Sequence, residues 1–87
     1  MSTHTPGPWV AVAPGADWLV RASDGRSFVV GDAIYHPENG ANARLIAAAP
    51  DLLRGLKYYV EHAELYSGYD EAEVRAADAA IAKAEGR

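Results

Sequence analysis

The chain has 87 residues, a net charge of −4 and no cysteine. The lack of cysteine excludes disulfides, zinc–thiolate sites and thiol catalysis. The negative charge argues against nucleic acid as the main partner, and it is too small for a DNA mimic. With one Phe and two Trp, a single domain over residues 1–87 buries only a modest core, which favours a homodimer.

The sequence gives no sign of a membrane or export segment. No apolar run approaches the length that spans a bilayer. Residues 1–8 lack the basic and apolar regions of a signal peptide. We therefore expect a cytoplasmic location and no membrane partner.

Residues 1–8 form a proline-containing lead-in, and three β-rich segments follow at 9–13, 18–22 and 27–30. Pro14-Gly15 separates the first two segments, and Asp24-Gly25 is typical of a type I′ hairpin turn between the second and third. Residues 33–35 could extend the third strand. The pattern predicts a three-stranded antiparallel β-meander over residues 9–35.

A proline-bent helix is expected over residues 39–66. Pro50 interrupts its apolar stripe, because proline inside a helix loses a hydrogen bond, so we expect helices at 40–49 and 50–66. Asn39, or alternatively Asn42, is expected to cap the helix N-terminus. The leucines should cover one face of the sheet. The stripe has the helical spacing of three and four residues: Leu45, Ala49, Leu52, Leu56, Tyr59, Ala63 and Tyr66.

A C-terminal helix is expected over residues 70–86, after a glycine at position 68 that suits a helix end. Asp70 and Glu73 have the spacing of a capping box. The apolar stripe of this helix is thin and alanine-rich, so it packs either on the preceding helix or on a second protomer. The fold class is therefore α+β: a three-stranded antiparallel β-meander, a proline-bent helix and a C-terminal helix.

Motifs for catalysis are lacking. The histidines His4, His36 and His62 do not have the spacing of metal ligands. The serines form no nucleophile elbow, and the glycines form no phosphate loop. We therefore expect a protein that is not an enzyme and that holds no metal or cofactor.

Two groups of polar and aromatic residues are candidate binding sites. A partner-binding face is proposed around the end of the long helix, since exposed Tyr and Arg are enriched at interfaces; the simpler interpretation is tyrosines at the rim of a small core. It comprises Arg54, Tyr58, His62, Tyr66 and Tyr69. The second group could hold an anion at a helix N-terminus, or simply cap it. It comprises His36, Asn39, Asn42 and Arg44.

Two segments carry a resemblance. The opening His-Thr-Pro-Gly-Pro-Trp (4–9) and the helix Ala-Asn-Ala-Arg-Leu-Ile-Ala-Ala-Ala-Pro-Asp-Leu-Leu (41–53) together resemble a family of small phage- and prophage-encoded proteins. The resemblance covers residues 4–57, and helix 70–86 falls outside it as a feature peculiar to this protein. It transfers no activity and no catalytic residue.

The resemblance implies a function by binding. Small phage accessory proteins without enzyme motifs often act on host proteins, so the expected function is inhibition of a host defence complex, as by anti-CRISPR proteins. One alternative is an oligomeric binder of a small ligand or nucleotide signal, with Arg44 at a protomer interface. Another is a regulatory or structural phage accessory protein.

Overall fold

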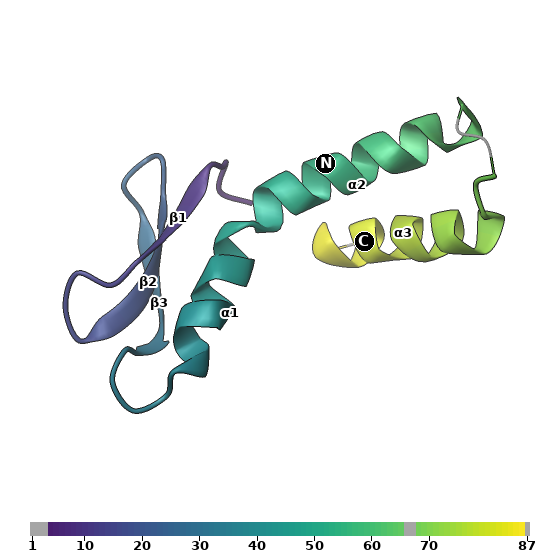
Figure 1. The fold of residues 1–87 in the computed structure, drawn as a ribbon. Helices are drawn as coiled ribbons and strands as arrows, with labels where there is room; N and C mark the ends of the chain where they lie inside the picture. The colour runs from purple at the N-terminus through teal and green to yellow at the C-terminus, as the bar shows by residue number, and fades with distance from the viewer. Residues whose placement is uncertain (1–3, 66–67, 87) are drawn as a thin grey trace. The chain divides into compact units, whose positions relative to one another are not determined.

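A computed structural model describes residues 4–65 and 68–86. The chain forms a three-stranded antiparallel sheet followed by helices (Figure 1), which confirms the α+β fold. Its elements are β1 (Trp9–Val12), β2 (Asp17–Ala22), β3 (Ser27–Asp32), α1 (Glu38–Ala47), α2 (Ala49–His62), the 3₁₀ helix η1 (Ala63–Leu65) and α3 (Glu71–Ala84).

Contacts divide the chain into two compact units. The sheet unit comprises residues 5–51, and the hairpin unit comprises residues 1–4 and 52–87. The division falls within the first turn of α2. That the two units form one folding domain stays a prediction.

The strands pair in the order β1-β2-β3. The hairpin between β2 and β3 differs from the expected type I′ turn: among the described residues only glycines have positive φ, and Gly25 has φ of 90°. The amide of Gly25 donates to the carbonyl of Ala22 at 3.1 Å, and the amide of Ala22 donates to the carbonyl of Arg26 at 2.7 Å. This is a longer turn closed by a glycine in the left-handed region.

One face of the sheet carries the core of this unit. Val20 and Ala22 of β2 are buried there. Trp9 is in register with Ala22, and Phe28 is in register with Val20, on either side of β2. Their rings meet edge to face, with centroids 5.6 Å apart. The small side chain of Ala22 leaves the space in which the two rings touch.

The helix α1 covers this face with its smallest residues. Gly40 and Ala43 are buried, and a Cβ atom at Gly40 would lie 3.1 Å from the Trp18 ring. Leu45 is 65% exposed, because the 100° turn per residue places it on the side of α1 opposite Gly40 and Ala43. The expectation that leucines cover the sheet is therefore wrong. The large side chains come from the strands, and the helix approaches them closely.

The loop from β3 to α1 is organised by Asp32. Its carboxylate accepts hydrogen bonds from the backbone amides of residues 34, 35 and 36, at 3.1, 2.6 and 3.2 Å. The chain therefore turns at once, and residues 33–35 do not extend β3. A register shift in the β2–β3 pairing, beside Trp18 and Leu19, marks a bulge shortly before this turn.

The expected cap of the first helix is wrong. The N-cap position of α1 is Pro37, with no side-chain cap, and both Asn39 and Asn42 lie inside the helix. The side-chain amide of Asn39 instead donates to the carbonyl of Asp32 at 3.0 Å. Asn39 thus ties α1 to the end of β3. A Cβ atom at Gly31 would collide with the Asn39 side chain, so glycine is needed at this approach.

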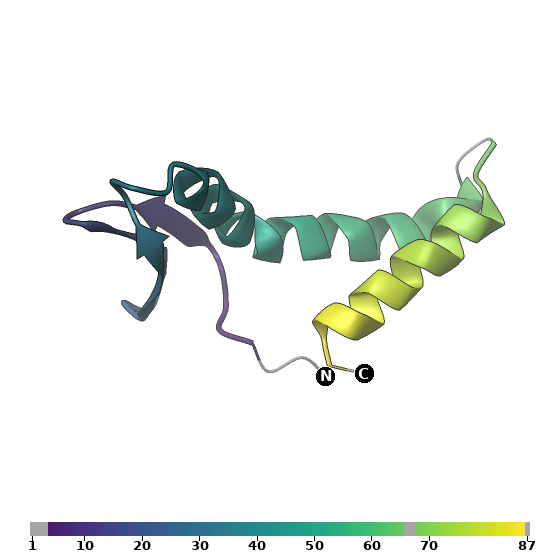
Figure 2. The same ribbon diagram turned by 90° about the horizontal axis from the view of Figure 1, so that it is seen from below.

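In the hairpin unit α3 runs back in the direction opposite to α2 (Figure 1), and the two helices diverge from the turn toward the end of α3 (Figure 2). Packing of α3 on a second protomer stays a prediction. Lys57 of α2 donates to the carboxylate of Glu85 after α3. Asp70 caps α3, accepting from the amide of Ala72 at 2.8 Å, as expected. Gly68 has φ of 76°. The preceding helix ends at His62 and continues as η1, short of the expected end at residue 66.

Candidate protein-binding surfaces

One side of α2 points away from α3. With 100° per residue, Tyr58 lies about 200° around the helix from Val60, and Val60 faces α3. Tyr58 is 57% exposed. The His62 ring stacks on the Tyr58 ring, with centroids 4.1 Å apart and an interplanar angle of 22°. The two rings form one rigid aromatic surface on the outside of the hairpin.

The backbone fixes the His62 ring as well. Its Nδ1 atom lies 2.9 Å from the carbonyl oxygen of Tyr58. A carbonyl oxygen only accepts, so Nδ1 must carry the proton and donate. The Nε2 atom is then the ring nitrogen that remains to meet a partner.

Large apolar side chains and a glycine surround this aromatic pair. Leu52 is 57% exposed and Leu65 is 79% exposed. At Gly55 a Cβ atom would meet nothing within 4 Å. These residues follow the helical spacing of three or four along one side. We call them the outer face of α2: Leu52, Gly55, Tyr58, His62 and Leu65.

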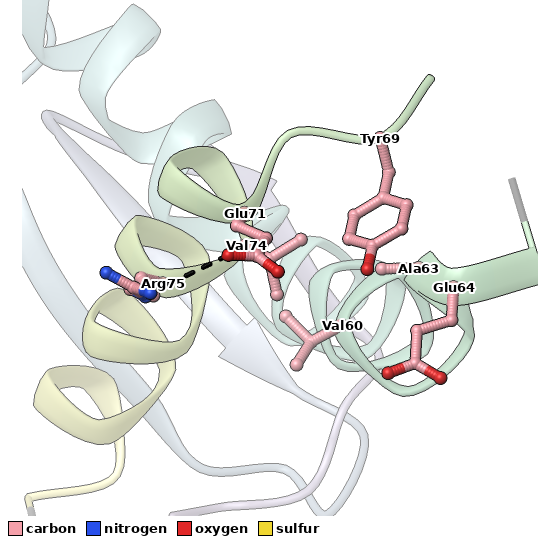
Figure 3. A pocket seen from close by; sticks show the side chains of 7 residues that line it. All are labelled: Val60, Ala63, Glu64, Tyr69, Glu71, Val74 and Arg75. Atoms are coloured by element: carbon pink, nitrogen blue, oxygen red, sulfur yellow. Dashed lines mark ion pairs between the residues drawn. The ribbon is translucent and has the colours of Figure 1, made fainter. Parts of the chain in front are cut away.

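A groove lies on the opposite side of α2, between α2 and α3 (Figure 3). Its volume is about 290 Å³. Glu71 and Arg75 form an exposed ion pair there, with 3.7 Å between the nitrogen and the carboxylate oxygen. The residues that line the groove are Val60, Ala63, Glu64, Tyr69, Glu71, Val74 and Arg75.

The structure divides the partner-binding face that the sequence predicts. Arg54, Tyr58 and His62 follow one another at intervals of four residues on the outer side of α2. Tyr69 instead lines the groove on the other side. Tyr66 lies outside the described residues. The binding role of these residues stays a prediction.

Three of the four residues in the second predicted group have their side chains engaged within the sheet unit. The ring of His36 contacts the carboxylate of Asp32, and Asn39 donates to the Asp32 carbonyl. The guanidinium of Arg44 lies 5.1 Å from the centroid of the Trp18 ring, a cation–π contact. Asn42 is exposed on α1. A ligand at this helix end would have to displace contacts that hold α1 on the sheet.

Hydrogen bonds set the charge state of the Asp32–His36 pair. The His36 ring and the loop amides hold the pKa of Asp32 at about 2, below its ordinary value of 3.8. The Asp32 carboxylate raises the pKa of His36, and Glu38 adds to this effect. The His36 ring therefore already has an acidic partner within the chain, the Asp32 carboxylate.

Sequence reasoning missed three features of these surfaces. Gly55, in the interior of a helix, is a visible signal, because glycine weakens a helix. Asp32 gave only the signal of an Asp before a loop, which is common to many turns. The groove depends on which faces of two helices meet, and no local pattern reports that.

Metal-binding clusters and membrane-spanning helices are both absent from the described part of the chain. Across 4–65 and 68–86, no three His, Asp or Glu side chains gather as ligands for a metal ion. Within the same ranges, no helix has the length and apolar character to cross a membrane.

The chain is thus a small α+β protein with two exposed surfaces on a helical hairpin. It belongs to a phage protein family: the family model described as Salmonella phage P22 protein Y8K6 matches residues 1–87. The match includes α3, so the expectation that this helix is peculiar to the present protein is wrong. Neither the curated proteins nor the solved structures contain a match to the chain.

Proposed function

We propose that this protein is a phage accessory protein that binds a host protein through the outer face of α2, and that the bound protein belongs to a host defence system. The observation that carries the binding proposal is Gly55, an open position between exposed apolar side chains. Membership of a phage protein family supports a host target.

Gly55 is costly for the free protein. A glycine inside a helix destabilises it by about 1 kcal/mol relative to alanine, because its backbone loses more freedom. Such a glycine is useful where another group approaches the backbone closely. Within the described chain nothing approaches it, because a Cβ atom there would meet no atom within 4 Å. A partner protein that packs closely against α2 at this point accounts for a glycine at position 55.

The neighbours of Gly55 suit such a partner. Leu52, Tyr58 and Leu65 present large side chains that are 57%, 57% and 79% exposed. Burying an apolar side chain of this size contributes about 1.5–3 kcal/mol. Tyr58 adds a rigid ring with a polar tip, and its stacking with His62 fixes it before binding. A pre-ordered aromatic group loses little freedom on association.

The defence target separates this proposal from its alternatives. A nucleotide-signal binder would use the α1 start, where His36, Asn39 and Arg44 already contact the chain itself. A regulatory or structural accessory protein would bind a protein without protecting phage from defence. A binding experiment and a plaque experiment together distinguish these outcomes.

The binding test compares two variants with the same added charge. Tyr58→Glu places a carboxylate in the outer face, and Ala76→Glu places one on the exposed side of α3. The full chain is used to capture host proteins, and each captured protein is purified and bound again in isolation. We expect a host protein that binds the wild type and Ala76→Glu equally, and Tyr58→Glu at least tenfold more weakly. Equal binding by all three would overturn the proposed face.

The defence test counts plaques on paired hosts with and without the defence system of the captured protein. We expect the wild type to raise phage yield only on the host that has the system, and Tyr58→Glu to lose this effect. No difference between hosts would reject the defence target and leave an accessory protein of another kind. Tight binding to a nucleotide panel, seen as a rise in melting temperature, would favour the ligand alternative.

A further inference from the structure

The groove between α2 and α3 combines an apolar floor with acidic ends. In the view of Figure 3, Val60 lies between the carboxylates of Glu71 and Glu64, Val74 lies beside Glu71, and the Tyr69 ring points toward Ala63. The apolar residues come from both helices, Val60 and Ala63 from α2 and η1 and Val74 from α3. The groove therefore offers hydrocarbon beside two carboxylates, of which Glu71 is paired with Arg75 and Glu64 forms no ion pair with another of the described lining residues.

This pattern matches one kind of side chain. Arg and Lys carry an apolar stem and a cationic head, and they cover apolar surface while their charge reaches a polar group. A carboxylate ligand would meet repulsion from Glu64 and Glu71. A purely apolar side chain would leave these carboxylates unused. Arginine fits best, because its planar head can also stack on an aromatic ring such as Tyr69.

The guanidinium of Arg75 already occupies one of the two carboxylates, Glu71. Arg75 lies 3.7 Å from Glu71, and the side chains of the pair are 83% and 75% exposed. Exposed pairs four residues apart on a helix are weak and are screened by salt. An incoming guanidinium can therefore replace Arg75 at Glu71 at small cost. Arg75 then acts as a competitor within the groove.

We propose that the groove lined by Val60, Val74, Glu64 and Glu71 binds an arginine side chain of a partner protein. The groove faces away from the outer face of α2, so this proposal does not rest on the proposed function. Binding through both surfaces would clamp a partner, or two partners, on opposite sides of one helix.

The test titrates the full ¹⁵N-labelled chain with three peptides that differ only at the central residue. The peptides are acetyl-Ala-Leu-X-Leu-Ala-amide, where X is arginine, citrulline or glutamate. We expect the arginine peptide to shift the amide signals of residues 60, 63 and 74. It should bind about two- to fivefold tighter than the uncharged citrulline peptide, because an exposed ion pair contributes a factor of about this size. Salt screens exposed charges, so the preference should be smaller at high salt. Equal binding of both peptides would overturn the proposal.

Variants locate the site and use the competitor. Glu64→Gln combined with Glu71→Gln should abolish the preference for arginine. Arg75→Gln should increase affinity for the arginine peptide, because the internal competitor is gone. Glu61→Gln is the matched control: it removes the same charge from α2 outside the groove lining and should keep the preference. Loss of the preference in Glu61→Gln alone, or signals that shift only outside the groove, would contradict the proposed site.

Discussion

The Nδ1 atom of His36 lies 2.5 Å from the Oδ2 atom of Asp32, between the end of the sheet and the start of α1. The same carboxylate accepts three backbone amides of the loop. This contact holds the pKa of Asp32 at about 2 and raises the pKa of His36 above 6.5. The start of α1 therefore depends on a pair that is fully charged only within a range of pH.

The stability of the chain should follow the charge of this pair. The raised pKa of His36 contributes stability that is complete below pH 6.5 and is lost as the pH rises through the folded pKa. The lowered pKa of Asp32 contributes stability that is complete above pH 3.8 and is lost as the pH falls through about 2. The combined contribution is largest between these limits. Urea midpoints measured at pH 5 and pH 9 check it.

His36→Gln is the variant for that measurement. It should lower the urea midpoint more at pH 5, below the ordinary histidine pKa of 6.5, than at pH 9, because the contribution of the raised His36 pKa is lost as the pH rises. Adding Asp32→Ala to His36→Gln should lower the midpoint at both pH values, because the loop amides then lose their side-chain acceptor. A loss in His36→Gln that is equal at pH 5 and pH 9 would show that the charge of the pair is unimportant.

A side chain at Gly40 should loosen α1 from the sheet. A Cβ atom there would lie 3.1–3.2 Å from three atoms of the Trp18 ring, and a leucine would add further atoms to this tight contact. We expect Gly40→Leu to lower the free energy of unfolding by about 1–3 kcal/mol, as overpacked cores do. The matched control is Gly15→Leu, where a Cβ atom meets nothing within 4 Å; it should stay within about 0.5 kcal/mol. Equal losses at both positions would argue against close packing at Trp18.

The Gly55→Ala variant separates stability from binding. Alanine favours the helix, and the position is open, so the free energy of unfolding should rise by about 0.4–1 kcal/mol. The melting temperature should rise by about 2–8 °C. Binding to the captured host protein should weaken, because the added methyl group lies where the partner approaches. A variant that is both more stable and equally tight would show that no partner needs a glycine at this position.

The ion pair between Lys57 and Glu85 should couple α2 to α3. The Glu85 side chain is 7% exposed and the Lys57 side chain is 42% exposed, so the pair is partly shielded from water. Lys57→Met removes the ammonium partner of a buried carboxylate and should cost about 1–3 kcal/mol. Adding Glu85→Leu should recover most of this loss, because the buried charge is then gone. Losses that simply add in a double-mutant cycle would show that the two residues act independently.

The elements of this fold could be predicted from local patterns. Alternating β-branched and aromatic residues predicted three strands, and Pro50 predicted a break, which falls at Ala48 with Pro50 in the first turn of α2. Asp70 was predicted as a cap because its side chain satisfies an amide two residues away. Such features depend on a few neighbouring residues, and the sequence displays them directly.

Features that depend on tertiary approach could not be predicted in this way. The stripe through Leu45 has the correct period, but the sheet is covered by the side with Gly40 and Ala43, because the strands already supply Trp18 and Val20. The side chain of Asn39 could hydrogen-bond either to its own helix or to the end of β3. It donates to the carbonyl of Asp32 in β3. For the same reason the local pattern groups Tyr69 with Tyr58, although Tyr69 lies between η1 and α3 and lines the groove on the side of α2 that faces away from Tyr58.

The most direct test of the central claim is site-specific cross-linking in infected host cells. A photo-reactive amino acid replaces Tyr58 on the outer face of α2 or, as a control, Ala76 on the exposed side of α3. We predict a discrete adduct with one host protein from position 58 and none from position 76. Adducts of equal yield from both positions, or only with a second copy of this chain, would contradict the claim that the outer face of α2 binds a host protein.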